Sequence, residues 1–274
     1  MKKWQAIVIN TDDVDKLLTA IQDNKDKNPG CKLINYWQHR WGEKILNEVK
    51  ETKRLPYGFV GDGWPKKTDQ SWALKHDTYK LSKAFLEHDC RDIGDAIYQA
   101  NIISEYLVNK KGHIYIVDFG SGYGRLAIPF IHKFRGMLTY IGIDYTACGL
   151  LIAPQFVEQA IDAKVKQWDD ETNDYKSYDF VSLPAWNIHK LYADYLKVDA
   201  FISVHSIQEM QPETINFYVR IMPELCKKNA IFYSINIEAE DKQIILPSQY
   251  REVFSRPFPI NRDGSYNEKC WRIK

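Results

Sequence analysis

Ile114-Tyr-Ile-Val-Asp-Phe-Gly-Ser-Gly-Tyr-Gly-Arg125 is an apolar run that leads into three closely spaced glycines. The part before the glycines has the length and composition of a short buried strand. The apolar residues after Arg125 predict a helix that reaches about Phe134. Glycine permits backbone angles that a side chain would forbid, and it lets a ligand lie directly on the main chain. The free N–H groups at the start of the helix suit an anionic group. This segment therefore predicts a strand, a ligand-binding turn and a helix.

The chain after this segment alternates between short apolar runs and amphipathic stretches. Further strands are expected at residues 138–144, 178–183, 198–204 and 230–237, with one helix ending near residue 163 and another at about 212–226. This order predicts an α/β fold, a Rossmann-like, doubly wound and mostly parallel sheet with helices on both faces. The tail offers two more strands, around residues 252–254 and 269–273.

The chain before this segment does not show the alternation of strands and helices. Residues 1–108 are expected to form a mainly helical, aromatic-rich N-terminal cap, and residues 109–274 the Rossmann-like domain. Helices are expected at 33–52 and 80–110, on either side of a glycine- and proline-rich loop at 56–65. In that loop Tyr57, Phe59 and Trp64 either form a stacking platform for a substrate or pack the loop onto the body. The composition leaves open whether the cap folds separately.

The overall composition excludes several classes of partner. The chain has 274 residues with 37 basic and 36 acidic side chains, and its net charge of +1 gives no reason to expect nucleic acid or a membrane surface as a partner. No apolar run reaches the roughly 18 residues that a membrane-spanning helix needs. The five cysteines have no metal-ligand or C-x-x-C spacing, which is typical of reduced thiols in a cytoplasmic protein. The oligomeric state stays open, a homo-oligomer included.

The spacing of the glycines distinguishes between cofactors. A dinucleotide-binding loop would require a glycine at position 125, which is arginine here, and the lysine of a phosphate-binding P-loop is absent. Asp118-x-Gly120-x-Gly122-x-Gly124 instead resembles motif I of the class I S-adenosylmethionine-dependent methyltransferases. In that family the loop wraps the methionine part of the cofactor, and the acid helps to anchor its amino group. The resemblance implies S-adenosyl-L-methionine as the cofactor, bound by Asp118, Gly120, Ser121, Gly122, Tyr123 and Gly124.

Two further positions bear on this resemblance. Asp144 ends the next predicted strand, where a carboxylate can accept hydrogen bonds from both ribose hydroxyls, and Tyr145 follows it. Members of the family often carry an acid after the third strand that contacts the adenine amino group. This sequence has none there, so Trp186 is expected to cover the ring, or Asn187 to replace the acid. The alternatives are a glycine turn without a ligand, a solvated Asp144 and a Trp186 that belongs to the core.

The fourth predicted strand ends in Ser203-Val-His-Ser-Ile-Gln-Glu-Met-Gln-Pro212. Ligands of this fold lie at the carboxyl ends of the strands, so His205 and Glu209 are the candidate catalytic residues. Histidine suits the removal of a proton from a hydroxyl because its pKa lies close to neutral. The structural alternative is a helix start, since Ser206-x-x-Glu209 matches a capping box. No cluster of residues has the spacing of a metal site, so no metal is expected.

The segment Gln208-Glu209-Met210, with the preceding His205 and Ser206, resembles the sugar O-methyltransferases found among bacterial surface-polysaccharide genes. This resemblance implies methylation of a hydroxyl group on a small molecule such as a sugar. Two alternatives remain: a methyltransferase acting on a nitrogen of a protein or small amine, and a non-catalytic binding module. The Asn/Asp-Pro-Pro-aromatic signature of amino-group methyltransferases is absent after the fourth strand, where Val204, His205 and Ser206 stand.

Overall fold

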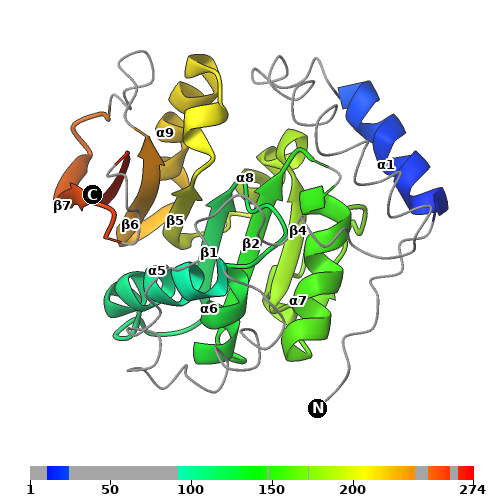
Figure 1. Cartoon of the computed structure of the whole chain (residues 1–274), viewed down its shortest axis with the longest axis horizontal. Coiled ribbons are helices and arrows are strands. Elements are labelled where there is room, and N and C mark those ends of the chain that lie inside the picture. Colours follow the sequence, from blue (N-terminus) through cyan, green and yellow to red (C-terminus); the bar gives the residue numbers. More distant parts are fainter. Residues whose placement is uncertain (1–10, 25–91, 147, 172, 238–245, 260–264) are drawn as a thin grey trace.

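The computed structural model describes residues 11–24, 92–146, 148–171, 173–237, 246–259 and 265–274 (Figure 1). Much of the predicted cap, including the helix at 33–52 and the loop with Tyr57, Phe59 and Trp64, lies outside these residues. So do residues 80–91 of the second predicted cap helix. The division of the chain into a cap and a Rossmann-like domain therefore stays a prediction.

The described strands form one mostly parallel sheet. In chain order they are β1 (Ile114–Phe119), β2 (Leu138–Asp144), β3 (Val165–Lys166), β4 (Phe180–Pro184), β5 (Val198–Val204), β6 (Cys226–Ile237), β7 (Tyr250–Pro257) and β8 (Tyr266–Ile273). Their order across the sheet is β3-β4-β2-β1-β5-β6-β8-β7. All pairs from β3 to β6 are parallel, and β8 is antiparallel to both β6 and β7. The predicted α/β, doubly wound fold is confirmed.

Helices cover both faces of this sheet. Figure 1 shows α5 (Asp92–Leu107), α6 (Ala127–Lys133) and α7 (Ala153–Ile161) on the face toward the viewer. A π-helical turn, Cys148–Ile152, leads into α7. The opposite face is covered by α8 (His189–Ala193) and α9 (Pro212–Leu225). Alternate strand residues supply the two cores, with Ile116, Tyr140 and Ile202 facing α5–α7 and Val117, Ile141 and Phe201 facing α8 and α9. Three short 3₁₀ turns, Tyr175–Ser177, Ala185–Asn187 and Ile207–Glu209, complete the described elements.

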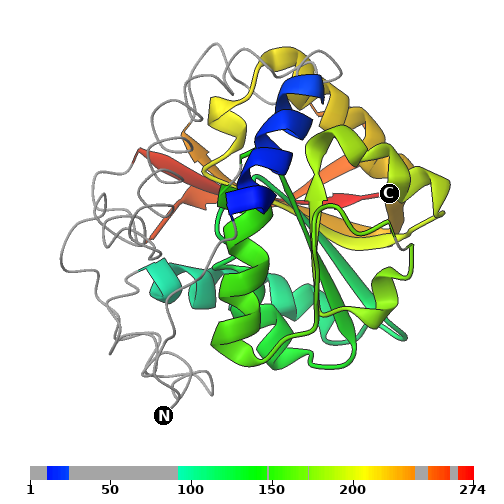
Figure 2. The ribbon, with the colours of Figure 1, turned by 90° about the vertical axis from the view of Figure 1, so that its right-hand side faces the viewer.

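The two described parts of the expected cap pack on the sheet domain. Helix α1 (Thr11–Asn24) buries Leu17 and Ile21, and α5 buries Ala96 and Ile103, all in the core that faces α6 and α7. Figures 1 and 2 agree that α1 lies at one end of α7. That end is the amino-terminal end of α7, at the carboxyl edge of the sheet, because α7 follows the carboxyl end of β2. These two helices therefore share a core with the sheet.

Several element bounds differ from those expected. Strand β6 begins at Cys226 instead of residue 230, and the tail strands are longer than the two short segments expected, forming the β7–β8 hairpin. The two-residue strand β3 was not expected. None of the described helices has both the length and the apolar character needed to cross a bilayer.

Candidate active site

The site lies where the order of the strands reverses. Chain order runs outward from β1 through β2 in one direction and through β5 and β6 in the other, which is where open α/β sheets bind ligands. The loops after β1 and β5 meet there. Ser206 Oγ donates to the carbonyl oxygen of Phe119 and lies 2.7 Å from Ser203 Oγ. A side chain at Gly120 would bring its Cβ to 2.4 Å from Ser206 Cβ, so the two loops are in direct contact.

The three loop glycines have different surroundings, although each has a positive φ. A Cβ at Gly120 would collide with Ser206, and a Cβ at Gly124 would lie 2.9 Å from Val157 Cγ2 of α7. Those two glycines allow close packing. A Cβ at Gly122 would meet none of the described residues within 4 Å, so this glycine faces open space within the described part of the chain. Gly122 is therefore the position at which the main chain is open to a ligand.

The side chains between the glycines turn away from that open space. Ser121 is buried, and a Cβ on Gly142 of β2 would lie 2.6 Å from its Oγ. The ring of Tyr123 packs edge-on against Phe156 of α7, with ring centroids 5.2 Å apart. Within the described part of the chain, Ser121 Oγ has no hydrogen-bond partner. Ser121 and Tyr123 therefore offer a ligand their backbone, and Ser121 keeps one unsatisfied hydroxyl nearby.

Asp144, at the end of β2, reaches the glycine loop. Its Oδ2 accepts a hydrogen bond from the Gly122 N–H at 2.9 Å. Its Oδ1 accepts from the N–H groups of Tyr145 and Thr146, both at 2.7 Å, and from Thr146 Oγ1 at 2.8 Å. Burial raises the pKa of Asp144, and these hydrogen bonds oppose the rise. Each carboxylate oxygen has about two acceptor sites. Among the described residues Oδ1 receives three donors and Oδ2 one, so Oδ2 retains room for one further donor.

Asp118 is the second buried carboxyl group at this edge. Its Oδ2 accepts a hydrogen bond from the Tyr140 hydroxyl of β2 at 2.6 Å. Burial raises its pKa to about 7, although the Tyr140 hydrogen bond and the charge of Arg125 lower it. Asp144 raises it further, since two like charges are close. The site thus holds a carboxyl group that changes charge near neutral pH.

His205 follows β5 in the left-handed region, with φ 59°. The backbone N–H of His205 donates to the carbonyl oxygen of Ile235 at 2.8 Å. Its ring packs edge-on against Tyr266, with centroids 4.5 Å apart, and lies 6.4 Å from the ring of Phe258. Burial, together with the charge of Arg125, lowers its pKa to about 3. The expectation of a pKa close to neutral is therefore wrong for this histidine, which is uncharged at physiological pH.

Glu209 lies in the 3₁₀ turn Ile207–Glu209 after β5, and the capping box is not formed. Ser206 makes no side-chain capping hydrogen bond, because its hydroxyl is directed to Phe119 and Ser203. The turn is held instead by Gln208, whose Oε1 accepts from the Ile237 N–H at 2.8 Å. The Ser206 half of the predicted capping box is therefore absent, and the role of Glu209 stays a prediction.

The remaining expected residues lie on opposite faces of the sheet. Tyr145 is half-buried against the core that faces α8 and α9. Trp186 is half-buried against the core that faces α6 and α7, in the short turn after β4. Trp186 is thus on the same face as Asp118 and follows the strand next to β2. Its packing agrees with the alternative of a core residue and leaves part of the ring exposed.

Tyr140 and Thr146 were missed from the sequence, and Arg125 and Ser206 were named there without a role in the ligand site. Tyr140 lies within an apolar strand and Thr146 acts through a single hydroxyl group, so neither stands out in the sequence. The strand register brings Tyr140 near Asp118, which pairs with Gly142, two residues after Tyr140. Over the described ranges, no group of three or more His, Cys, Asp or Glu side chains is placed to hold a metal ion.

No family model and no curated protein sequence matches this chain. Among solved structures, the plantazolicin methyltransferase BpumL, in complex with a monoazolic desmethylPZN analog and SAH, is 12% identical with a TM-score of 0.43, and the match covers 84% of this chain and 99% of that one. The magnesium protoporphyrin IX methyltransferase ChlM from Synechocystis PCC 6803, with bound SAM, is 11% identical with a TM-score of 0.44, covering 77% and 100%.

TrmN from Thermus thermophilus is 14% identical with a TM-score of 0.44, and the match covers 64% of this chain. The matched part is 48% of that protein, so this chain spans about half of its length.

Proposed function

We propose that this protein is an S-adenosylmethionine-dependent methyltransferase that methylates a hydroxyl group of a small molecule such as a sugar. The observation that carries this proposal is the meeting of the glycine loop with Asp144 at the reversal point of the sheet, where the Gly122 N–H donates to Asp144 Oδ2. Gly120 and Gly124 serve close packing, whereas a Cβ on Gly122 would meet none of the described residues within 4 Å.

The polar groups around Gly122 fit the parts of this cofactor. The free lone pair of Asp144 Oδ2 suits a ribose hydroxyl, and the Asp118 carboxylate suits a cationic amino group. Arg125 supplies positive charge near Asp118, as its effect on the pKa of that group indicates, and it suits the carboxylate of the cofactor. The exposed part of Trp186, beyond β4, is available to the adenine ring.

When bound, the cofactor supplies a methyl group on a positively charged sulfur, which a nucleophile can displace directly. The protein must then align the acceptor and exclude water. His205 is buried, uncharged and held by Tyr266, so its ring can accept a hydrogen bond from the acceptor hydroxyl over the whole physiological pH range. Its low pKa favours orientation of that hydroxyl over complete removal of its proton. Glu209, in the turn that follows, is the second candidate for contact with the acceptor.

Methylation of a nitrogen is the second candidate function, and the low pKa of His205 favours it. A neutral amine attacks without prior loss of a proton, so it needs no strong base. The two candidates differ in the effect of removing the imidazole. In His205→Ala, loss of turnover with intact cofactor binding supports hydroxyl methylation. Unchanged turnover of an amine acceptor by the same variant supports methylation of a nitrogen.

Calorimetric titration with S-adenosylmethionine and S-adenosylhomocysteine, with NADH as a negative control, tests the cofactor. We expect micromolar binding of the first two ligands and none of the third. Gly122→Val should abolish this binding. Gly136→Val is the matched control, because Gly136 also has a positive φ (74°) and open space around it, but it precedes the amino-terminal end of β2. Equal loss of binding in both variants, or no binding by folded wild-type protein, would overturn the proposal.

A further inference from the structure

Asp118 and Tyr140 are joined across two strands in the interior of the molecule. In the parallel register of β1 and β2, Tyr140 stands beside Ile116, and Gly142 stands beside Asp118. Tyr140 therefore lies two register positions before Asp118 on the same face of the sheet, and its hydroxyl reaches Asp118 Oδ2 at 2.6 Å. Both side chains are buried, Asp118 with 4% exposure and Tyr140 with none.

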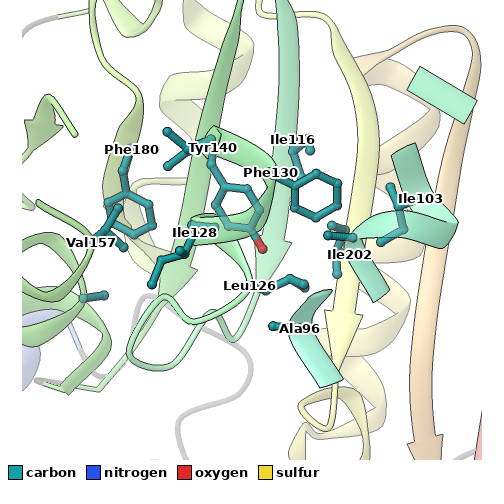
Figure 3. Close-up of a cluster of buried hydrophobic side chains, with 14 of the residues drawn as sticks. Ala96, Ile103, Ile116, Leu126, Ile128, Phe130, Tyr140, Val157, Phe180 and Ile202 are labelled. Atoms are coloured by element: carbon teal, nitrogen blue, oxygen red, sulfur yellow. The ribbon is translucent and has the colours of Figure 1, made fainter. Parts of the chain in front are cut away.

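The ring of Tyr140 is fixed by its neighbours. Its centroid lies 5.9 Å from that of Phe130 of α6 and 6.2 Å from that of Phe180 of β4. Figure 3 shows Tyr140 between these two residues, with its hydroxyl oxygen on the side of Leu126, which follows the glycine loop. The packing leaves the hydroxyl little freedom, so its direction is set before any ligand binds.

The two oxygens of Asp118 have different surroundings. Within the described residues, Oδ2 accepts the Tyr140 hydroxyl and Oδ1 accepts no hydrogen bond. The carboxylate is thus held by one oxygen and offers the other. We propose that Tyr140 is a positioning residue of the ligand site, whose hydroxyl fixes the Asp118 carboxylate so that Oδ1 receives the amino group of the ligand. This inference rests on the proposed function.

The hydrogen bond also affects the charge of Asp118. Burial raises the pKa of this group to about 7, and the Tyr140 hydroxyl and Arg125 hold it below the value that burial alone would give. Asp144, at the end of β2, acts in the opposite direction. Without the hydroxyl, a larger share of Asp118 would be protonated at neutral pH. A protonated carboxyl group is a poor partner for a cation, so binding of an amino group should weaken.

Two ligands separate this role from a purely structural one. S-adenosylhomocysteine carries the amino group, whereas 5′-methylthioadenosine has the same nucleoside without the amino-acid part. In Tyr140→Phe at pH 7 we expect the affinity for the first ligand to fall about ten-fold, the usual effect of losing one hydrogen bond to a charged group. The affinity for the second ligand should stay unchanged. Binding of S-adenosylhomocysteine should strengthen as Asp118 loses its proton. The pH at which this happens should move from about 7 in the wild type to a higher value in Tyr140→Phe.

Tyr233→Phe is the matched control. Tyr233 is also fully buried, on the same face of the sheet, and its hydroxyl donates to the buried Glu268 Oε1 at 2.5 Å. The Tyr233→Phe variant should bind S-adenosylhomocysteine and 5′-methylthioadenosine with wild-type affinity. If Tyr140→Phe does not fold, Tyr140→Met offers a flexible side chain without a hydroxyl. Equal weakening of both ligands, or no change in either, would overturn the inference. Wild-type protein that binds neither ligand would overturn the proposed function, and the inference with it.

Discussion

Glycine residues that share a positive φ can serve different physical purposes in one loop. Gly120 is required because the loops after β1 and β5 touch, whereas a Cβ on Gly122 would meet none of the described residues within 4 Å. Alanine at either position adds the strain of a left-handed backbone, about 1–2 kcal/mol. Only at Gly120 does the new Cβ also overlap Ser206 Cβ, at 2.4 Å.

Gly120→Ala should therefore lower the free energy of unfolding by about 2–5 kcal/mol, the sum of strain and overpacking. Gly122→Ala should lower it by about 1–2 kcal/mol, since strain alone acts there. Urea unfolding followed by circular dichroism measures both values. Equal losses in the two variants would mean that Gly120 is not in contact with the loop after β5.

Asp118 provides a second test at the level of a single residue. Its pKa is about 7 in the folded chain and 3.8 as a free side chain, so between these pH values the folded state binds a proton that the unfolded state lacks. Stability from this group is therefore greatest below pH 3.8, falls as the pH rises from 3.8 to about 7, and is constant above that. The total change is about 4 kcal/mol. Asparagine does not titrate, so the Asp118→Asn variant should not show this fall in stability with pH.

The difference in unfolding free energy between Asp118→Asn and the wild type should thus shift in favour of the variant from pH 4.5 to pH 8. Urea unfolding at four pH values measures it, and the wild type at each pH corrects for all other titrating groups. The same variant should bind the cofactor more weakly, which is a common cost of burying a functional charge. A difference that stays constant with pH would show that Asp118 is not protonated at neutral pH.

At the level of elements, a buried carboxylate joins the β7–β8 hairpin to the rest of the sheet. Glu268 of β8 is fully buried and accepts hydrogen bonds from Tyr233 of β6, Tyr98 of α5 and Arg256 of β7. Arg256 Nε lies 2.7 Å from Glu268 Oε2. Four elements thus meet at one side chain, two residues along β8 from Tyr266, which contacts His205.

Glu268→Ala leaves these three donors without their acceptor, so the free energy of unfolding should fall by about 3–5 kcal/mol. Glu252→Ala in β7 is the control, because Glu252 is exposed. Thermal unfolding monitored by circular dichroism checks both variants. A loss below about 1 kcal/mol in Glu268→Ala would mean that the network contributes no more than a surface ion pair.

The elements differ in how far the sequence predicts them. Residues 114–119 and 138–144 form strands at the expected bounds, because both are continuous apolar runs of strand length. The start of β6 was missed, since Lys227, Lys228 and Asn229 are polar and break the apolar pattern. Strand β3 has only two residues, and its Lys166 is charged, so no periodicity can reveal it.

The candidate site divides in the same way. The glycine loop and Asp144 are local patterns and could be found from the sequence, and the structure brings them into contact through the Gly122 N–H. Tyr140 could not be found, because its role depends on the register between two strands. The low pKa of His205 could not be expected either, since it results from burial among residues distant in sequence.

At the scale of the whole molecule, α1 from the amino-terminal part shares a core with the sheet. Leu17 has no exposed surface, whereas Gln22 on the same helix is exposed. Leu17→Ala should lower the free energy of unfolding by about 2–4 kcal/mol within a single cooperative transition, and Gln22→Ala should leave it unchanged. Calorimetry of both variants checks this. A separate early transition for Leu17→Ala would mean that α1 detaches independently of the sheet.

We propose that Gly122, Asp118 and Asp144 form one cofactor site at the reversal point of the sheet. A crystal structure of the full chain grown with S-adenosylhomocysteine is the direct test. We expect the ligand to lie along the main chain at Gly122, with a ribose hydroxyl on Asp144 and the amino group on Asp118. A ligand bound elsewhere, or an empty loop at saturating ligand, would contradict it.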